Sequence, residues 1–183
     1  MKKPTWHLDY YRTTDDLEFK LSHYIRDYIF QHRLRFMICF RKAQRCRFKP
    51  LKLFYDFKLY IFSRKYGIEI KSDTKIGKGF VMTHPYNITI SPGAVIGDNV
   101  SMMKGSTIGL SGGKREGVPT IGNKVLIGIN STVVGGITVG DDVLIAPNTF
   151  VNEDIPSHSV VIGNPCKIIH KENATKQYIW KTV

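Results

Sequence analysis

A six-residue repeat constrains the fold of this chain more than any other feature of the sequence. From residue 121 an aliphatic side chain recurs at every sixth position, and a small residue follows most of these positions. The recurring residues are Ile121, Ile127, Val133, Val139, Ile145 and Val151. The fifth position of each hexad is small or β-branched throughout, namely Val125, Ser131, Ile137, Val143, Thr149 and Ile155. An internal repeat of this kind outweighs local propensities when a fold is predicted.

The same period extends toward the N-terminus, with two interruptions. The earlier residues that keep the phase are Ile70, Ile76, Met82, Ile88, Ile96, Met102 and Ile108. Ile96 follows Ile88 after eight residues, and Ile121 follows Ile108 after thirteen. Both interruptions predict loops that project from the repeat. The second loop is the glycine-rich, charged segment 110–119.

A six-residue period over about 80 residues fits neither the 3.6-residue period of a helix nor the alternation of a long strand. It fits a chain that winds in coils of short strands, where one aliphatic residue per side points inward. Backbone hydrogen bonds then stack successive coils about 4.8 Å apart. Three sides of six residues make a coil of 18, so the spacing predicts a mainly β protein with a parallel β-solenoid over residues 67–170. The strand in "VVIGNPCKII" is expected to close the repeat, and residues 171–183 to form a tail.

Residues 1–66 differ from the repeat in charge and in periodicity. They contain 16 Lys and Arg against 6 Asp and Glu, a net charge of +10, whereas residues 67–183 contain 11 against 9, a net charge of +2. Two helices are predicted in this segment. The first has one apolar face, made of Leu17, Leu21, Tyr24, Ile25, Tyr28 and Ile29. The second follows Pro50 and extends to Lys65. We therefore expect a small, basic helical segment before the solenoid.

The densest run of positive charge lies between Arg33 and Lys52. It holds eight basic residues and no acidic one, with Phe, Leu and Ile interleaved. This mixture suits an anionic membrane surface or an acidic glycan. A solvated helix face with packed aromatic residues is the alternative explanation. No nucleic-acid-binding fingerprint accompanies the charge, so a nucleic-acid partner is not expected.

Composition narrows the class of protein further. Hydrophobic residues make up 42% of the chain and charged residues 23%, which is typical of a globular protein. No apolar run is long enough for a membrane span and no apolar signal region follows Met1, so we expect a cytoplasmic location. The basic segment leaves open a peripheral contact at the inner membrane face. The odd number of cysteines, Cys39, Cys46 and Cys166, predicts free thiols.

Three stretches of the repeat resemble a known family. They are "KIGKGFVMTHPYNITISPGAVIGDNVSM", "TIGLSGGKREGVPTIGNKVLIG" and "DDVLIAPNTFVNEDIPSHSVVIGNPCKII". They resemble the hexapeptide-repeat acyltransferases, and within them the serine acetyltransferase-like branch, which includes O-acetyltransferases of capsular and other surface polysaccharides. The resemblance implies a left-handed β-helix, a homotrimer with sites between subunits, and acetyl-CoA as acyl donor. Zinc enzymes with a similar solenoid use three histidines, but the clear repeats here contain only His84 and His158, so no metal is expected.

The resemblance also implies which residues form the site. His84 matches the catalytic histidine, and imidazole suits a general base because it titrates near neutral pH. On the acceptor side the implied residues are Thr83, Pro85, Tyr86 and Val118, with the loop 110–119 shaping the pocket. Along the acetyl-CoA groove they are Gly109, Gly128, Ala146 and Lys167. Small residues would let the pantetheine arm approach the backbone, and the lysine would meet the phosphates.

Two positions depart from the pattern of that family. Thr83 stands where serine acetyltransferases carry an aspartate that orients the catalytic histidine, and a hydroxyl supplies no charge to stabilise imidazolium. Gly117-Val118-Pro119 stands where they carry Arg-His-Pro, whose histidine helps to hold the amino acid. These departures favour a hydroxyl of a sugar or surface-polysaccharide precursor as acceptor. L-Serine O-acetylation for cysteine synthesis is the first alternative, and a non-catalytic solenoid that serves as a binding or assembly module is the second.

Overall fold

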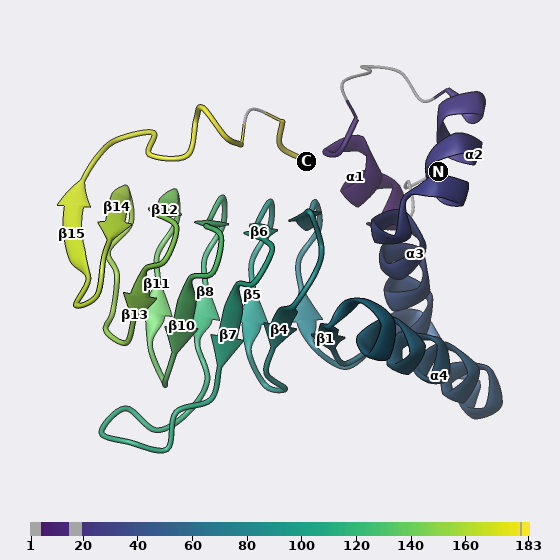
Figure 1. Cartoon of the computed structure of the whole chain (residues 1–183), viewed down its shortest axis with the longest axis horizontal. Coiled ribbons are helices and arrows are strands. Elements are labelled where there is room, and N and C mark those ends of the chain that lie inside the picture. The colour runs from purple at the N-terminus through teal and green to yellow at the C-terminus, as the bar shows by residue number, and fades with distance from the viewer. Residues whose placement is uncertain (1–4, 15–19, 180) are drawn as a thin grey trace.

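Helices precede a β-solenoid in this chain (Figure 1). The computed structural model describes residues 5–14, 20–179 and 181–183. The helices in these ranges are α1 (Thr5–Tyr11), α2 (Leu21–Phe30), α3 (His32–Arg45) and α4 (Lys49–Tyr66). Gly67 ends α4 in the left-handed conformation, at φ 66°, and the first strand begins at the next residue. The solenoid therefore starts directly from the last helix.

Three sheets form the walls of the solenoid. Sheet I contains β1 (Ile68–Ile70), β4 (Ile88–Ile90), β7 (Thr107–Gly109), β10 (Thr132–Val134) and β13 (Phe150–Val151). Sheet II contains β2 (Lys75–Ile76), β5 (Val95–Ile96), β8 (Thr120–Ile121) and β11 (Thr138–Val139). Sheet III contains β3 (Val81–Thr83), β6 (Ser101–Met103), β9 (Leu126–Ile127), β12 (Val143–Ile145), β14 (Ser159–Ile162) and β15 (Lys167–His170).

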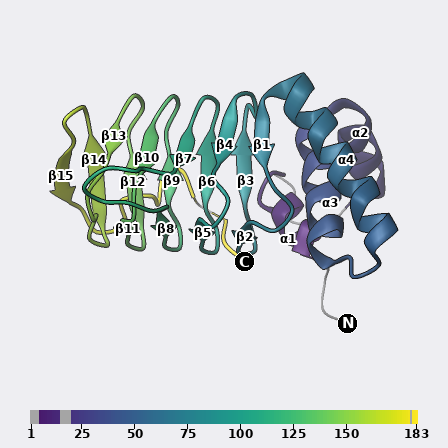
Figure 2. The same ribbon diagram turned by 90° about the horizontal axis from the view of Figure 1, so that it is seen from below.

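The walls wind through about five coils, which Figure 2 shows from below. Strands pair in parallel, apart from β15, which pairs antiparallel with β14 and ends sheet III. The register places each hexad on the next, with Ile70 beside Ile90 and Met82 beside Met102. The predicted left-handed parallel β-helix is confirmed, because the chain superimposes on solved solenoids of that kind, which are described below.

The hexad residues form the core, as the repeat predicts. All thirteen aliphatic residues that keep the six-residue phase are at most 7% exposed. The six residues at the fifth hexad position are at most 2% exposed. The longer interruption is the predicted loop between β7 and β8, from sheet I to sheet II. The shorter one was placed wrongly at 88–96: the register stacks Ile90, and not Ile88, on Ile70 and Ile108, so the two extra residues lie between β3 and β4, in the turn that contains His84 and Pro85. Each hexad thus places two side chains inside the solenoid, which accounts for the strictness of the pattern.

The corners of the solenoid repeat a backbone conformation that the sequence analysis did not identify. Asn130 and Asn148, 18 residues apart, have φ of 55° and 58° where sheet III passes to sheet I. Lys124 and Asp142, also 18 residues apart, have φ of 52° and 54° where sheet II passes to sheet III. Asn and Asp tolerate this left-handed region better than most residues. Their 18-residue spacing was the signal available in the sequence.

Helix α3 closes the open end of the solenoid. Its buried residues Phe36, Met37, Cys39, Phe40 and Ala43 belong to the same core cluster as the hexad residues. Of the eight basic residues in the run from Arg33, only Arg41 is buried, while Phe36 and Phe40 between them pack in the core, which agrees with the alternative of a solvated face with packed aromatic residues. The apolar residues between the charges cap the core of the first coil.

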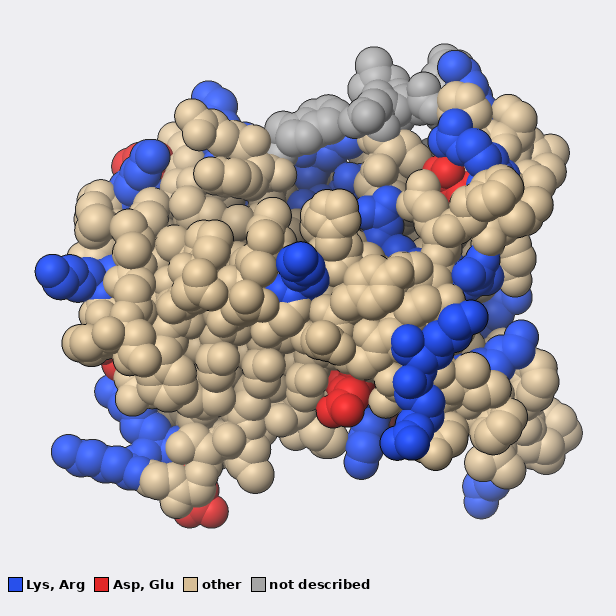
Figure 3. All heavy atoms as spheres, viewed as in Figure 1, with Lys and Arg blue, Asp and Glu red and all other residues tan. Residues whose placement is uncertain are grey.

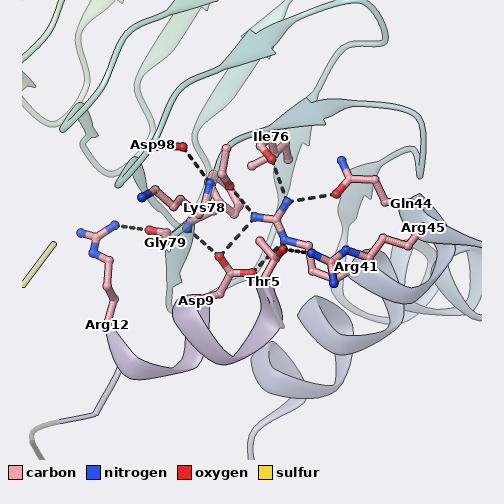
Figure 4. Close-up of polar contacts among 12 residues, drawn as sticks. Thr5, Asp9, Arg12, Arg41, Gln44, Arg45, Ile76, Lys78, Gly79 and Asp98 are labelled. Carbon is pink, nitrogen blue, oxygen red and sulfur yellow. Dashed lines mark hydrogen bonds and ion pairs between the residues drawn. The ribbon is translucent and has the colours of Figure 1, made fainter. Parts of the chain in front are cut away.

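A buried ion pair fastens this cap (Figure 4). Arg41 of α3 is 2% exposed, and its Nε donates to Asp9 Oδ2 of α1 at 2.8 Å. The guanidinium also donates to the carbonyl oxygens of Ile76 and Gly77 in the first coil, at 2.7 and 2.5 Å. Burial raises the pKa of Asp9, against the opposing effect of Arg41 and the Phe80 amide. One arginine thus joins two helices to the solenoid.

Helix α2 carries the apolar face that the sequence predicts, but this face is not packed on the solenoid. Leu21, Ile25 and Ile29 are 64, 50 and 56% exposed, whereas Asp27 is 5% exposed. Leu17, which was assigned to the same face, lies outside the described residues. Among the described helices, none combines the length and the apolarity needed to cross a membrane.

The C-terminal segment runs back along the corner between sheets II and III and ends near α1 (Figure 1). Asp142 anchors its middle: the Ala174 and Thr175 amides both donate to this carboxylate at 3.0 Å, and the Thr175 hydroxyl donates at 2.7 Å. His158 Nδ1 lies 3.0 Å from the same carboxylate. At its end, Val183 exchanges two hydrogen bonds with Asn99. The tail therefore connects the last coils to the second.

Acidification is expected to release the middle of this tail. Burial acts to raise the pKa of Asp142. The hydrogen bonds from Thr175, His158 and Ala174 together lower it by more than burial raises it, so the folded pKa lies below the usual value. A depressed folded pKa means that the stabilisation is complete above the unfolded pKa, about 3.9, and is lost as pH falls through the folded value. NMR titration of the Ala174 and Thr175 amides should show them shifting below about pH 4. A midpoint above that pH would contradict the anchoring role.

Candidate active site

His84 occupies the turn that follows β3, at the corner where sheet III passes to sheet I. We call this corner, formed by residues 84–87, 104–106, 128–131 and 146–149 of successive coils, the III–I edge. The backbone of His84 is in the left-handed region, at φ 50°, and its side chain is exposed. No residue in the described part of the chain is hydrogen-bonded to its imidazole. The ring is therefore available to a molecule that lies along this edge.

The helical cap holds this turn in place. His32 of α3 is hydrogen-bonded through Nε2 to the carbonyl oxygen of Pro85, at 3.2 Å. Its ring stacks on Tyr66 with centroids 4.1 Å apart and contacts Tyr86 at 4.9 Å. The Asn87 amide donates to the carbonyl of Tyr66 at 3.0 Å. A non-glycine residue at positive φ needs such support, because the conformation is costly by itself.

His32 and Tyr66 are thus residues of the site that sequence reasoning missed. They belong to the helical segment, and no periodicity in the sequence relates them to His84. Burial lowers the pKa of His32, the nearby charges of Arg35, Arg33 and Lys65 lower it too, and the bond with Pro85 opposes them. His32 is therefore neutral at neutral pH and holds the turn as an uncharged ring.

Of the four residues assigned to the acceptor side, the structure brings three to His84. Thr83 is half-buried at the end of β3, Pro85 is buried, and Tyr86 is 48% exposed. Within the described residues, the Thr83 hydroxyl is not hydrogen-bonded to His84. Nothing in the described part of this chain takes the place of the orienting aspartate.

Val118 lies elsewhere, on the loop 110–119 between β7 and β8. This loop leaves sheet I at the corner toward sheet II, which we call the I–II edge, so the strands of sheet I separate it from His84. Val118 is half-buried against the solenoid core. Arg115 of the loop pairs with Asp154 at 2.6 Å, and Gly117 bridges back to Ser111. Within one chain, Val118 and His84 do not meet.

The residues assigned to the acetyl-CoA groove divide between the same two edges. Gly128 and Ala146 lie on the III–I edge, two and three coils beyond His84, and Lys167 begins β15, paired with Ile162. At about 4.8 Å per coil, the two small residues are roughly 10 and 14 Å from the coil of His84. Gly109 ends β7 on the I–II edge, beside the loop. One edge therefore carries His84 and most of the residues assigned to the groove.

Coil stacking alone explains the small size of Gly128. A Cβ atom at residue 128 would lie 2.7 Å from the carbonyl oxygen of Ile145 in the next coil. Real Cβ atoms do not approach backbone that closely. The glycine is thus required by the fold, whether or not a ligand lies against it.

A hollow of about 660 Å³ lies between α4 and the first two coils, lined among others by Lys52, Asp56, Tyr60, Ser72 and Ser91, and His84 does not line it. Its lining includes the end of β4 and the residues just after it, which form part of the I–II edge, the edge that also carries the loop 110–119. His84 itself faces an open edge. No group of His, Cys, Asp or Glu in the described ranges could hold a metal ion.

Comparison with known proteins identifies the repeat and its relatives. Residues 119–153 match the family model described as bacterial transferase hexapeptide, six repeats. A serine acetyltransferase from Helicobacter pylori is 41% identical over 109 residues, which cover 58% of this chain and 63% of that protein. Serine acetyltransferase 4 of Arabidopsis thaliana is 41% identical over 110 residues, which cover 58% of this chain and 30% of that protein. The chain thus spans less than two thirds of the length of these relatives.

Solved structures extend the likeness to the helical cap. The serine acetyltransferase of Brucella abortus superimposes with a TM-score of 0.76 and 26% identity, over 91% of this chain and 68% of that one. The serine acetyltransferase of Neisseria gonorrhoeae in complex with serine superimposes with a TM-score of 0.71 and 26% identity, over 90% of this chain and 66% of that one. Both the cap and the solenoid are therefore arranged as in these proteins.

Proposed function

We propose that this chain, a hexapeptide-repeat protein of the serine acetyltransferase branch, transfers an acetyl group from acetyl-CoA to a hydroxyl group of a small acceptor. The observation that carries the proposal is the exposed imidazole of His84, held on a supported left-handed turn at the edge of the solenoid. Nine described non-glycine residues share a positive φ, several of them at ordinary corners of the solenoid, so the exposure of the imidazole, and not the backbone conformation, supports the proposal.

The chemistry requires a base because a neutral hydroxyl group, which still carries its proton, is a poor nucleophile. His84 takes the proton from the acceptor hydroxyl as the hydroxyl oxygen of the acceptor attacks the thioester carbonyl carbon, and the carbon–sulfur bond then breaks. The protonated imidazole returns the proton to the departing CoA thiolate, which leaves as the thiol. The new ester bond replaces the thioester bond, and His84 ends the cycle in its starting form.

A ring of three subunits would complete the site. His84 and the loop 110–119 lie on different edges of one chain, so the two edges can meet only between copies. Contact between two different surface patches of identical subunits generates a closed ring when the rotation closes. The loop of one subunit would then cover the III–I edge of the next, with acetyl-CoA along Gly128, Ala146 and Lys167. The missing orienting group for His84 would come from that neighbour.

L-Serine is the acceptor that we propose first. The comparisons favour it over the sugar hydroxyl that the sequence favours, because the similar proteins are named serine acetyltransferases and one of them is solved with serine bound. No similar protein described above is a polysaccharide enzyme, so nothing beyond the sequence departures supports that acceptor. A sugar hydroxyl remains the second candidate on one observation: Val118, packed on the core, offers no charge or hydrogen bond to an amino acid.

A thiol-release assay tests both the activity and the acceptor. Acetyl-CoA is incubated with the full chain and with L-serine, simple sugars, nucleotide sugars or short acidic oligosaccharides, and CoA release is followed against a reaction without acceptor. The expected result is release that depends on L-serine. Release with a sugar and not with serine would transfer the assignment to the second candidate. Failure to bind CoA in calorimetry would overturn the enzymatic proposal and favour the binding module.

A further inference from the structure

The outer face of α4 exposes a continuous apolar stripe. Leu53, Phe54, Phe57, Tyr60 and Ile61 are 71, 50, 58, 58 and 47% exposed. These positions follow the three- and four-residue steps that place side chains on one side of a helix. The opposite side, with Leu59 buried and Tyr55 and Phe62 partly buried, packs on the core. The stripe is therefore additional to the face that holds α4 in the fold, and such a surface marks an interaction site.

Positive charge flanks the stripe on the same helix. Helix α4 contains Lys49, Lys52, Lys58, Arg64 and Lys65 against a single acid, Asp56. Asp56 is paired with Lys52 at 2.9 Å, and Lys52 also donates to Ser72 of the first coil, so this pair belongs to the inner side. The Lys58 ammonium lies 4.8 Å from the centre of the Phe54 ring. Lys and Arg side chains gather around α4 at the lower right of Figure 3.

We propose that this outer face of α4 docks on an anionic phospholipid surface. Aromatic and aliphatic side chains bordered by lysines are the composition of a helix that lies in the plane of the membrane interface. The apolar stripe would enter the boundary of the acyl chains while Lys49, Lys58, Arg64 and Lys65 meet the lipid phosphates. The site is thus α4, which shares only Lys49 and Lys52 with the basic run from Arg33; the other six residues of that run precede α4.

Charge complementarity favours a lipid surface over a second copy of this chain. The segment 1–66 has a net charge of +10, from 16 basic and 6 acidic residues. Two such faces in contact would bring like charges together as they buried their apolar stripes, whereas an anionic surface neutralises them. In the ring of three subunits proposed above, the three α4 faces would lie at the same end of the assembly and would bind one surface together.

Vesicle cosedimentation tests the proposal with the full chain. We expect binding to vesicles of phosphatidylcholine with phosphatidylglycerol, weak binding to phosphatidylcholine alone, and loss of binding at high salt. The K58E/R64E variant should bind roughly 10- to 100-fold more weakly, at the usual contribution of a juxtamembrane Lys or Arg. The L53S/F57S variant should also bind more weakly. The matched control is K171E/K176E, the same change of charge on exposed lysines of the C-terminal segment.

Two results would overturn the proposal. One is equal loss of binding in K171E/K176E, which would mean that net charge, and not α4, governs the interaction. The other is absence of vesicle binding together with a concentration-dependent increase in molar mass that L53S/F57S abolishes, which would assign the stripe to a contact between copies. Acetyl transfer to a soluble acceptor by both α4 variants separates these outcomes from failure of the proposed activity, because α4's outer face does not touch His84.

Discussion

Replacement of His84 by asparagine is expected to lower kcat for acetyl transfer by roughly 10²–10⁴-fold, the usual contribution of a positioned general base. The imidazole is exposed and no described residue hydrogen-bonds to it, so its loss leaves no partner unsatisfied. Asparagine is the chosen substitute because residue 84 has a φ of 50°, a conformation that Asn adopts at lower cost than Ala. The measurements are kcat from thiol release and Tm from thermal unfolding.

The matched control is His170→Asn, which alters an exposed histidine at the far end of the solenoid, 71% exposed in its side chain and beside Glu172. We expect both variants to keep the Tm of the parent chain and only His84→Asn to lose activity. Unchanged kcat in a folded His84→Asn variant would contradict the assignment of the base. A fall in Tm would instead show that the ring serves the turn, in which case His32→Gln should produce the same fall.

Replacement of Arg41 by alanine is expected to destabilise the fold by about 3–5 kcal/mol, the cost of breaking a buried ion pair from one side. Asp9, which is 1% exposed, would lose its cationic partner and keep only backbone amides, and the carbonyls of Ile76 and Gly77 would lose their donor. For a chain of this length the loss corresponds to a fall in Tm of roughly 6–20 °C. Thermal or urea unfolding followed by circular dichroism measures it.

A double-mutant cycle separates the pair from its surroundings. The double variant D9A/R41A should be less destabilised than the sum of D9A and R41A, because removal of both partners leaves no buried charge unpaired. Lys52→Ala is the control, since the Lys52–Asp56 pair is more than one third exposed on both sides and pairs of that kind contribute about 1 kcal/mol or less. Additive effects of the two single changes would show that Arg41 acts through the carbonyls of the first coil and not through Asp9.

The core of the solenoid could be predicted from the sequence because it depends on one local rule. An aliphatic residue at every sixth position identifies the inward side of each wall, and the interruption at 108–121 identifies the long loop. Neither inference needs a contact between distant residues. The shorter interruption was placed at 88–96, whereas the register puts its two extra residues between Met82 and Ile90, because Ile88 and Ile90 are both buried and the sequence alone does not say which one keeps the phase. His84 was singled out by the motif around it, and its function as the base stays a prediction. The family resemblance then supplied its role.

The surroundings of His84 could not be predicted, because they depend on contacts across the chain. His32 reaches Pro85 from 53 residues away, and its position follows from how α3 packs on the first coil. Thr83 and Val118 were both assigned to the acceptor side, and the structure places them at different edges of sheet I within one chain. The comparisons then moved the preferred acceptor from a sugar to L-serine.

The helical cap also shows where charge counts mislead. The run from Arg33 to Lys52 has the highest density of positive charge in the sequence. One of its eight basic residues, Arg41, is nevertheless buried, where it donates hydrogen bonds to two carbonyl oxygens and pairs with the Asp9 carboxylate. The apolar residues between the charges close the solenoid. Net charge predicts the sign of a surface potential, but only the packing of the helices decides which cations face the solvent.

The stacked coils have a further consequence, which concerns length. His84 lies in the first coil, and Lys167 follows the fifth, so their separation is a whole number of steps of about 4.8 Å. A point substitution in a wall cannot change that number. Insertion or deletion of a complete 18-residue coil would change it by one step and leave every corner intact. In the proposed site, the number of coils between His84 and Lys167 therefore sets the length of the donor molecule that could contact both residues.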